Sequence, residues 1–207
     1  MQFSDSIKNM IAPAAADIAS CSPPEISEIS GFLTVFCLND QLGLLRYKEP
    51  YRRFASLFIR KSHQAAMDYS IGRRSILEYL ELARSQDEKL GLLSQSISSF
   101  EKCIFNLSLA HILLARMLGL EGVAFGKLKE WASEKAVHDI CNRIKHFDED
   151  ILNQNRTDVF SPMWISDEGI HSTTASVPWS ELAAMLEELR NTCRVITTHP
   201  ESQSTDT

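Results

Sequence analysis

The chain has 207 residues, of which 44% are hydrophobic and 23% are charged, and its formal net charge is −6. This length and composition allow a core that needs no disulfide or metal, and they predict one helical domain over residues 1–198. The polar segment 199–207 is predicted to be a disordered tail. The negative charge disfavours a protein that coats nucleic acid, because phosphate binding needs a positive surface.

Charge is distributed unevenly along the chain. Residues 46–74 carry about +6 and residues 148–207 about −8. Two arginine pairs of the basic stretch are candidate nucleic-acid contacts: Arg52 with Arg53, and Arg73 with Arg74. The basic and acidic stretches are interpreted either as complementary surfaces, within or between chains, or as solvated faces.

The cysteines and the most apolar segment bear on the compartment. Five cysteines lie far apart without a C-x-x-C pair, which is typical of a reducing compartment in which buried thiols act as small hydrophobes. The most apolar long window, 103–120, contains Asn106, His111 and Arg116, which would be costly in lipid. We therefore predict a cytoplasmic protein without membrane contact.

Hydrophobic periodicity predicts helices along most of the chain. In chain order they cover residues 4–20, 26–45, 51–83, 90–118 and 127–151, with a last helix from Pro178. The second helix is expected to have most of its surface covered, and Gly72 is expected to interrupt the third. The fourth has apolar residues in unbroken steps of three and four, which indicates a long amphipathic helix paired with the one before it.

A short segment near residues 163–177 differs from the helices around it. Met163 to Ile165 predicts a strand, Asp167 to Gly169 a turn, and Val177 the end of a returning strand. The predicted fold is therefore all-α, a bundle of five to six helices built on a long antiparallel helical hairpin. A small β-hairpin insert near residues 163–177 completes it.

Common nucleotide, zinc and serine-hydrolase motifs are absent from the sequence. The remaining candidate is the helix at 127–151, where helical geometry places His138, Asn142 and His146 in one row opposite the apolar stripe, with Arg143 on the flank. Such a histidine, with an amide and a cation beside it, can exchange a proton and stabilise a phosphate. The same row is also what the solvated face of an amphipathic helix looks like, and both interpretations stay open.

The segment from Asn142 to Asp148 resembles the R-N-x-x-x-H signature of the HEPN superfamily, as does the layout of two long helices followed by a motif helix. The resemblance implies an all-α fold, a role in toxin–antitoxin or antiviral defence systems, and a metal-independent ribonuclease assembled as a homodimer. It assigns His146 as acid–base, Asn142 as the orienting residue, and Arg143 or the Arg52/Arg53 pair as phosphate contacts. Cys141 occupies the position of the family's arginine, and this departure puts catalysis in question.

Two functional hypotheses follow. The first is a HEPN-like module without catalysis, which regulates or interacts with a partner in a bacterial defence or toxin–antitoxin system. The second is the metal-independent ribonuclease acting as a homodimer, so whether the protein is an enzyme stays open. We expect a homodimer or a helical protein partner, with RNA binding as an alternative, and we predict no cofactor and no metal.

His111, and His146 together with Asp150, are also candidate metal ligands by residue type. His111 lies in the seam of the long helix, where a core histidine with a satisfied nitrogen is the expected role. Its proximity to the motif helix in a bundle keeps it of interest. His146 and Asp150 are one helical turn apart, but acids at a helix end are usually solvated.

Overall fold

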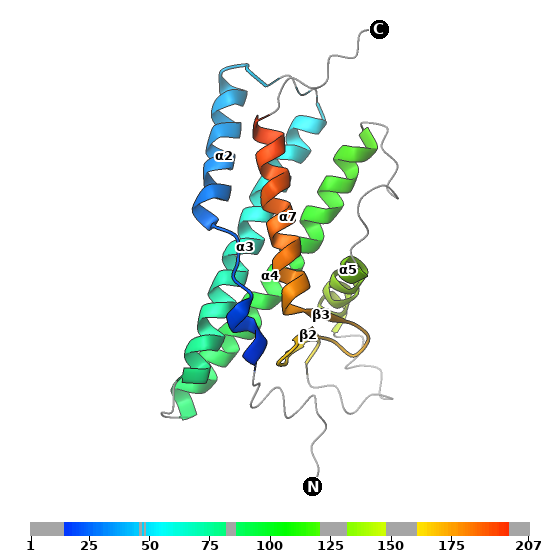
Figure 1. The fold of residues 1–207 in the computed structure, drawn as a ribbon. Coiled ribbons are helices and arrows are strands. Elements are labelled where there is room, and N and C mark those ends of the chain that lie inside the picture. Colours follow the sequence, from blue (N-terminus) through cyan, green and yellow to red (C-terminus); the bar gives the residue numbers. More distant parts are fainter. Residues whose placement is uncertain are drawn as a thin grey trace.

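The computed structural model describes residues 15–45, 47, 49–81, 86–120, 132–147 and 161–198. Within these ranges the protein is mostly helical, with a small three-stranded sheet near the C-terminal end (Figure 1). The elements are η1 (Ala16–Ser20), α2 (Ile26–Gln41), α3 (Tyr51–Glu81), α4 (Gln86–Leu120), α5 (Ala132–Lys145), β1 (Trp164–Ile165), β2 (Gly169–His171), β3 (Ser176–Pro178) and α7 (Trp179–Thr198). The predicted fold class is confirmed.

Helices α3 and α4 form the long antiparallel pair on which the bundle is built, and they pack along their length (Figure 1). The seam of α4 is buried most deeply at its middle, where Phe100, Ile104 and Leu107 have no exposed surface. Leu90, at the start of the same stripe, is 58% exposed. The apolar periodicity of α4 therefore marks the side that faces the core, with Leu90 as an exposed exception.

Gly72 does not interrupt helix α3, contrary to the expectation from sequence. The helix continues through it from Tyr51 to Glu81, and Gly72 is buried. A Cβ atom at this position would lie only 3.0 Å from Cζ of Phe100. The glycine therefore lets the aromatic ring of α4 approach the backbone of α3, which is a packing role rather than a helix-breaking one.

A polar network crosses the interface between α3 and α4. Lys61 donates to Oδ1 of Asn106 at 2.9 Å, and Nδ2 of Asn106 donates to Oδ2 of Asp68 at 2.9 Å. Burial raises the pKa of Asp68, while the hydrogen bond from Asn106 lowers it. Asn106 thus bonds to two residues of α3, and these polar contacts favour one register between the two helices.

Helix α2 is less covered than predicted, and it ends at Gln41 rather than Leu45. Among its residues only Ile29 and Phe36 are buried. Gly43 closes the end with a φ of 68°, in the left-handed region that glycine tolerates. One side of α2 is therefore exposed, because the helix lies at the edge of the bundle (Figure 1).

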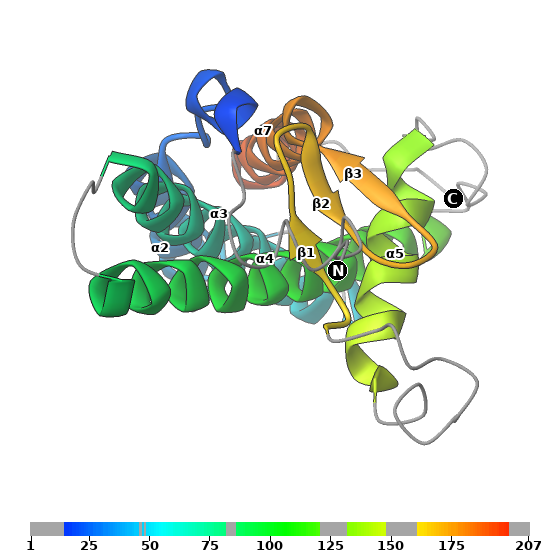
Figure 2. The same cartoon turned by 90° about the horizontal axis from the view of Figure 1, so that it is seen from below.

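The predicted β-hairpin is part of a three-stranded antiparallel sheet with the order β1-β2-β3. Ile165 pairs with Ile170, and Ile170 with Val177, so one apolar face is buried. The sheet lies beside α5 and the start of α7 (Figure 2). The last helix begins at Trp179, while Pro178 ends β3.

An aromatic cluster joins α3, α4 and α7. The Phe100 ring lies 5.8 Å from that of Tyr69 and 4.9 Å from that of Trp179. Tyr69 donates to the carbonyl of Cys21 at 2.8 Å, and Trp179 Nε1 donates to the carbonyl of Ser166 at 3.1 Å. Both polar atoms find partners, so the buried rings also fix the segment after η1 and the sheet.

Two predicted helices are only partly described. Of the predicted helix 4–20, the described part is the 3-10 helix Ala16–Ser20. Of the predicted helix 127–151, residues 132–145 are helical, and 127–131 and 148–151 lie outside the described residues. The predicted tail, 199–207, also lies outside them.

One described helical stretch, Leu90–Gly119, is long and apolar enough to cross a membrane by length and composition alone. Of its most apolar window, 44% is buried inside the protein. A core helix of a water-soluble protein meets the same criterion, so the absence of membrane contact stays a prediction.

Candidate functional site

Helix α5, which carries the candidate motif, crosses beside α4 and contacts β3 (Figure 2). Its buried apolar side chains are Val137, Ile140 and Cys141, the polar Ser133 is buried as well, and the acidic residue Glu134 lies in its first turn. The predicted apolar stripe of this helix is therefore confirmed at Val137 and Ile140. Cys141 joins that stripe with 1% of its surface exposed, so its side chain faces the core.

Two of the predicted catalytic residues share the solvent-facing side of this helix. Asn142 and His146 are exposed and one turn apart, and the backbone N–H of His146 donates to the carbonyl of Asn142 at 3.0 Å. Arg143 is half-buried on the flank. Lys145 is exposed, and its Nζ lies 5.2 Å from the ring centre of Phe105 on α4.

His138 does not continue that exposed row. It is half-buried and turned toward α4, where its Nδ1 is hydrogen-bonded to Oγ of Ser108 at 2.8 Å. Its ring centre lies 6.2 Å from that of His111. The helical-wheel arithmetic placed His138 opposite the apolar stripe, whereas in the structure α4 covers this flank of α5.

The neighbourhood of His138 holds a second and better-defined cluster, formed by His111, Glu134 and His138. One ligand-type atom from each residue lies within 4.8 Å of the other two. His111 is 9% exposed, and its Nδ1 has no hydrogen-bond partner within the described part of the chain. Burial, together with the nearby His138, lowers the pKa of His111 to about 4, so the ring is neutral at physiological pH.

Sequence reasoning singled out His111 and His138 separately and missed Glu134 and Ser108. The signal for Glu134 was present, because a carboxylate and a histidine four residues apart share one helical face. His111 is buried, as expected for a core histidine, and among the described residues its Nδ1 has no hydrogen-bond partner.

The predicted nucleic-acid contacts are engaged within the chain at three of four positions. Arg52 pairs with Asp40 and Glu49, both at 2.9 Å, and Arg53 pairs with Glu49 at 3.2 Å. Arg73 donates to the carbonyls of residues 18 and 19 at 3.1 and 2.7 Å. Arg74 is exposed. The two pairs lie in different parts of α3, and acids accompany the first pair.

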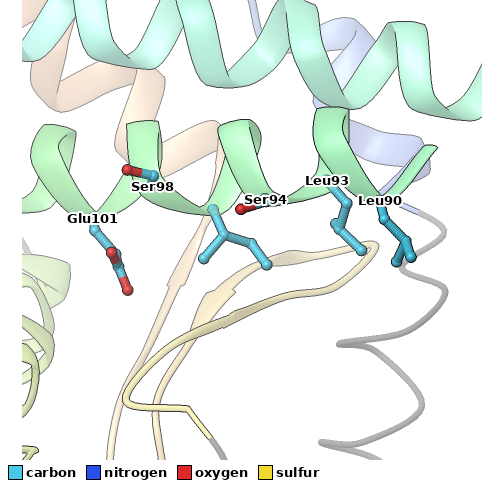
Figure 3. A pocket seen from close by; sticks show the side chains of 6 residues that line it. Leu90, Leu93, Ser94, Ser98 and Glu101 are labelled. Carbon is cyan, nitrogen blue, oxygen red and sulfur yellow. The ribbon is translucent and has the colours of Figure 1, made fainter. Parts of the chain in front are cut away.

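Two open hollows lie on the described surface, and only the first contains any of these arginines. One of about 450 Å³ lies beside Arg52 and Arg53 and also contains Asp40 and Glu49. The other, of about 300 Å³, is lined by Leu90, Leu93, Ser94, Ile97, Ser98 and Glu101. Figure 3 shows its side chains projecting from α4 alone. Neither brings a candidate catalytic histidine together with an arginine.

The cysteines are all free thiols, and three of them, Cys103, Cys141 and Cys193, are buried. Burial raises the pKa of Cys103, and it raises the pKa of Cys193 to about 12. Cys103 and Cys193 therefore stay protonated at neutral pH, and all three buried cysteines pack as small side chains in the core.

Comparison of the chain with protein-family models, with curated proteins and with solved structures finds no match.

Proposed function

We propose that this chain is a HEPN-like helical module of a bacterial defence or toxin–antitoxin system, and that it binds a protein partner without cleaving RNA. The observation that carries this proposal is the burial of Cys141, which stands where the resembling motif has its arginine. An arginine contributes to phosphate chemistry only if its guanidinium reaches the substrate. On this helix that position points into the core, so a guanidinium at position 141 would not reach a substrate beside Asn142 and His146.

The exposed side of α2 supports a role in binding. Its apolar side chains Val35, Leu38 and Leu42 recur at helical spacing and are 44%, 55% and 69% exposed, and Leu44 follows at 57%. A contiguous apolar strip of this kind on a surface helix is typical of a protein–protein contact. A two-fold axis would bring the same strip of two copies together, so a homodimer is the partner we expect first.

The alternative function is the metal-independent ribonuclease. The exposure of Asn142 and His146 on one side of α5 favours it, because a substrate phosphate could reach both side chains. In that case the missing cation would come from another position, with Arg143 as the nearest candidate on the helix.

An RNA cleavage assay in EDTA separates the two functions. We expect both the wild-type chain and His146→Ala to leave total RNA intact. Cleavage by the wild type that is lost in His146→Ala, and retained in the matched variant His63→Ala on α3, would refute the non-catalytic proposal and support the ribonuclease.

The binding half of the proposal is tested by the mass in solution over a range of concentrations. We expect a dimer that Leu38→Glu dissociates, while Val195→Glu on α7, also at an exposed position, leaves it intact. A chain that stays monomeric at all concentrations would exclude the homodimer. A mass that neither variant changes would show that the dimer forms through another surface.

A further inference from the structure

The cluster of His111, Glu134 and His138 brings donor atoms from two helices to one point. His111 comes from the middle of α4, and Glu134 and His138 lie one turn apart on α5. The three donor atoms lie within 4.8 Å of one another. In a tetrahedral zinc site the ligand atoms lie about 3.3 Å apart, from bond lengths of about 2.0–2.2 Å. Small side-chain rotations would therefore close this group around an ion.

We propose that His111, Glu134 and His138 form a binding site for a divalent transition-metal ion of the zinc type. Two imidazoles and one carboxylate are the donor set of many zinc sites that keep a fourth position open to water. Harder ions such as Mg²⁺ and Ca²⁺ prefer sites made of oxygen atoms alone. The site goes beyond the proposed partner-binding function and shares no residue with the exposed pair Asn142 and His146.

The unpartnered nitrogen of His111 is an independent observation for this assignment. Among the described residues its Nδ1 has no hydrogen-bond partner, and the residue is 9% exposed. A buried polar atom without a partner destabilises the fold, so such atoms are rare in native proteins. Ligation would supply the partner that this imidazole lacks, or would fix its ring so that it gains one.

Ser108 provides the outer support that a metal-binding histidine usually has. Its Oγ is hydrogen-bonded to Nδ1 of His138, which fixes the ring and leaves Nε2 as the nitrogen for an ion. Ser108 is itself buried, with 2% of its surface exposed. Partners of this kind orient metal ligands, and their loss typically weakens metal affinity about 10–100-fold.

The partial exposure of two of the three ligands gives an ion access to the site. Glu134 and His138 are half-buried, so the site opens on the side of α5, while His111 forms its inner wall. The site would join α4 and α5, and binding would therefore stabilise the packing of the motif helix.

Zinc binding to the full chain, stripped with EDTA and then dialysed, tests the site directly. We expect one Zn²⁺ per chain and a higher melting temperature when zinc is added. Glu134→Gln and His138→Gln should each weaken binding by about 100-fold or more, since they remove a ligand, and Ser108→Ala by about 10–100-fold. The matched controls His146→Gln, directly after the end of α5, and His63→Gln, on α3, should bind as the wild type does.

Cobalt distinguishes this site from adventitious binding to thiols. Co²⁺ bound by the cluster should show the d–d absorption of a nitrogen and oxygen environment without thiolate charge transfer, and Cys37→Ser should leave it unchanged. Zinc binding that persists in both Glu134→Gln and His138→Gln would overturn the proposal, as would a wild-type chain that takes up no zinc. Loss in His146→Gln would do so too. These outcomes are independent of RNA cleavage and of dimer mass, so failure here is distinct from failure of the proposed function.

Discussion

The ring of Phe100 on α4 lies against the backbone of Gly72 on α3, where a Cβ atom would approach Cζ of the ring to 3.0 Å. Phe100 has little room to retreat, because Tyr69 and Trp179 flank it in the core. The contact therefore depends on the absence of a side chain at Gly72.

Gly72→Ala should lower the stability of the protein although alanine is the better helix former. Alanine gains about 1 kcal/mol in a helix interior, whereas overpacking a core typically costs about 1–3 kcal/mol. We expect a net loss of about 1 kcal/mol by urea denaturation. Gly91→Ala on α4 is the matched control, because nothing lies within 4 Å of a Cβ there. Gly91→Ala should stabilise the protein by up to about 1 kcal/mol. If both variants were stabilised, or both destabilised, the packing role of Gly72 would be contradicted.

Asn106→Ala should break the polar connection between α3 and α4. The variant removes a hydrogen bond from Lys61 and one to Asp68. Leaving polar partners unsatisfied typically costs about 1–3 kcal/mol, so we expect a loss of that size in the free energy of unfolding. The exposed Asn142→Ala should change it by about 0.5 kcal/mol or less. Similar losses in the two variants would show that the network contributes nothing specific.

The elements that sequence reasoning predicted correctly are those with long apolar periodicity. The core stripe of α4, from Leu93 to Leu107, follows from steps of three and four. The role of Gly72 could not be predicted, because it depends on a ring from another helix. The exposure of α2 was missed for a related reason, since its apolar residues, such as Leu38, do not indicate whether a neighbouring helix covers them.

The candidate site, too, depends on contacts between helices that the sequence pattern of one helix does not predict. The row of His138, Asn142 and His146 is correct for an isolated helix, and two of the three are indeed exposed. The direction from which α4 approaches decides that His138 instead meets Ser108 and His111. Spacing along one helix therefore predicted the exposed pair, whereas the three-residue cluster needed the packing of two helices.

The titration of His111 should make the metal-free protein less stable in mild acid. Its pKa is lowered from 6.5 to about 4 in the fold, so between these values the unfolded chain binds a proton that the folded chain does not. Stability from this group is present above pH 6.5 and is lost as the pH falls to about 4, by at most about 3 kcal/mol. Asp68 and Glu101, whose pKa values burial raises, contribute with the opposite sign.

The contribution of His111 is isolated by comparing the wild type with His111→Gln in the presence of a chelator. Within the described residues, His138 and Glu134 are titratable groups close to it, and both remain in the variant. The stability difference between the two chains should change by up to about 3 kcal/mol between pH 7 and pH 4. Asn142→Gln should give a difference that is constant with pH. A constant difference for His111→Gln as well would show that burial does not suppress protonation of this ring.

Cys141→Arg tests whether the motif arginine can be restored. The Cys141 side chain is 1% exposed, so the new guanidinium would have to be buried or would displace α5 from α4. Breaking apolar packing with an unpaired charge typically costs about 3 kcal/mol or more, and we expect at least that loss by denaturation. We also expect no RNA cleavage. Asn142→Arg, one position further on the exposed side, should leave stability within about 0.5 kcal/mol of the wild type.

The opposite result for Cys141→Arg would be as informative. A variant that folds like the wild type and cleaves RNA, with the cleavage lost on adding His146→Ala, would place the guanidinium within reach of substrate. It would mean that α5 can rotate to expose position 141, and that one substitution separates this chain from a ribonuclease. The burial of Cys141 argues against that rotation, because Val137 and Ile140 are anchored in the same core and would have to leave it.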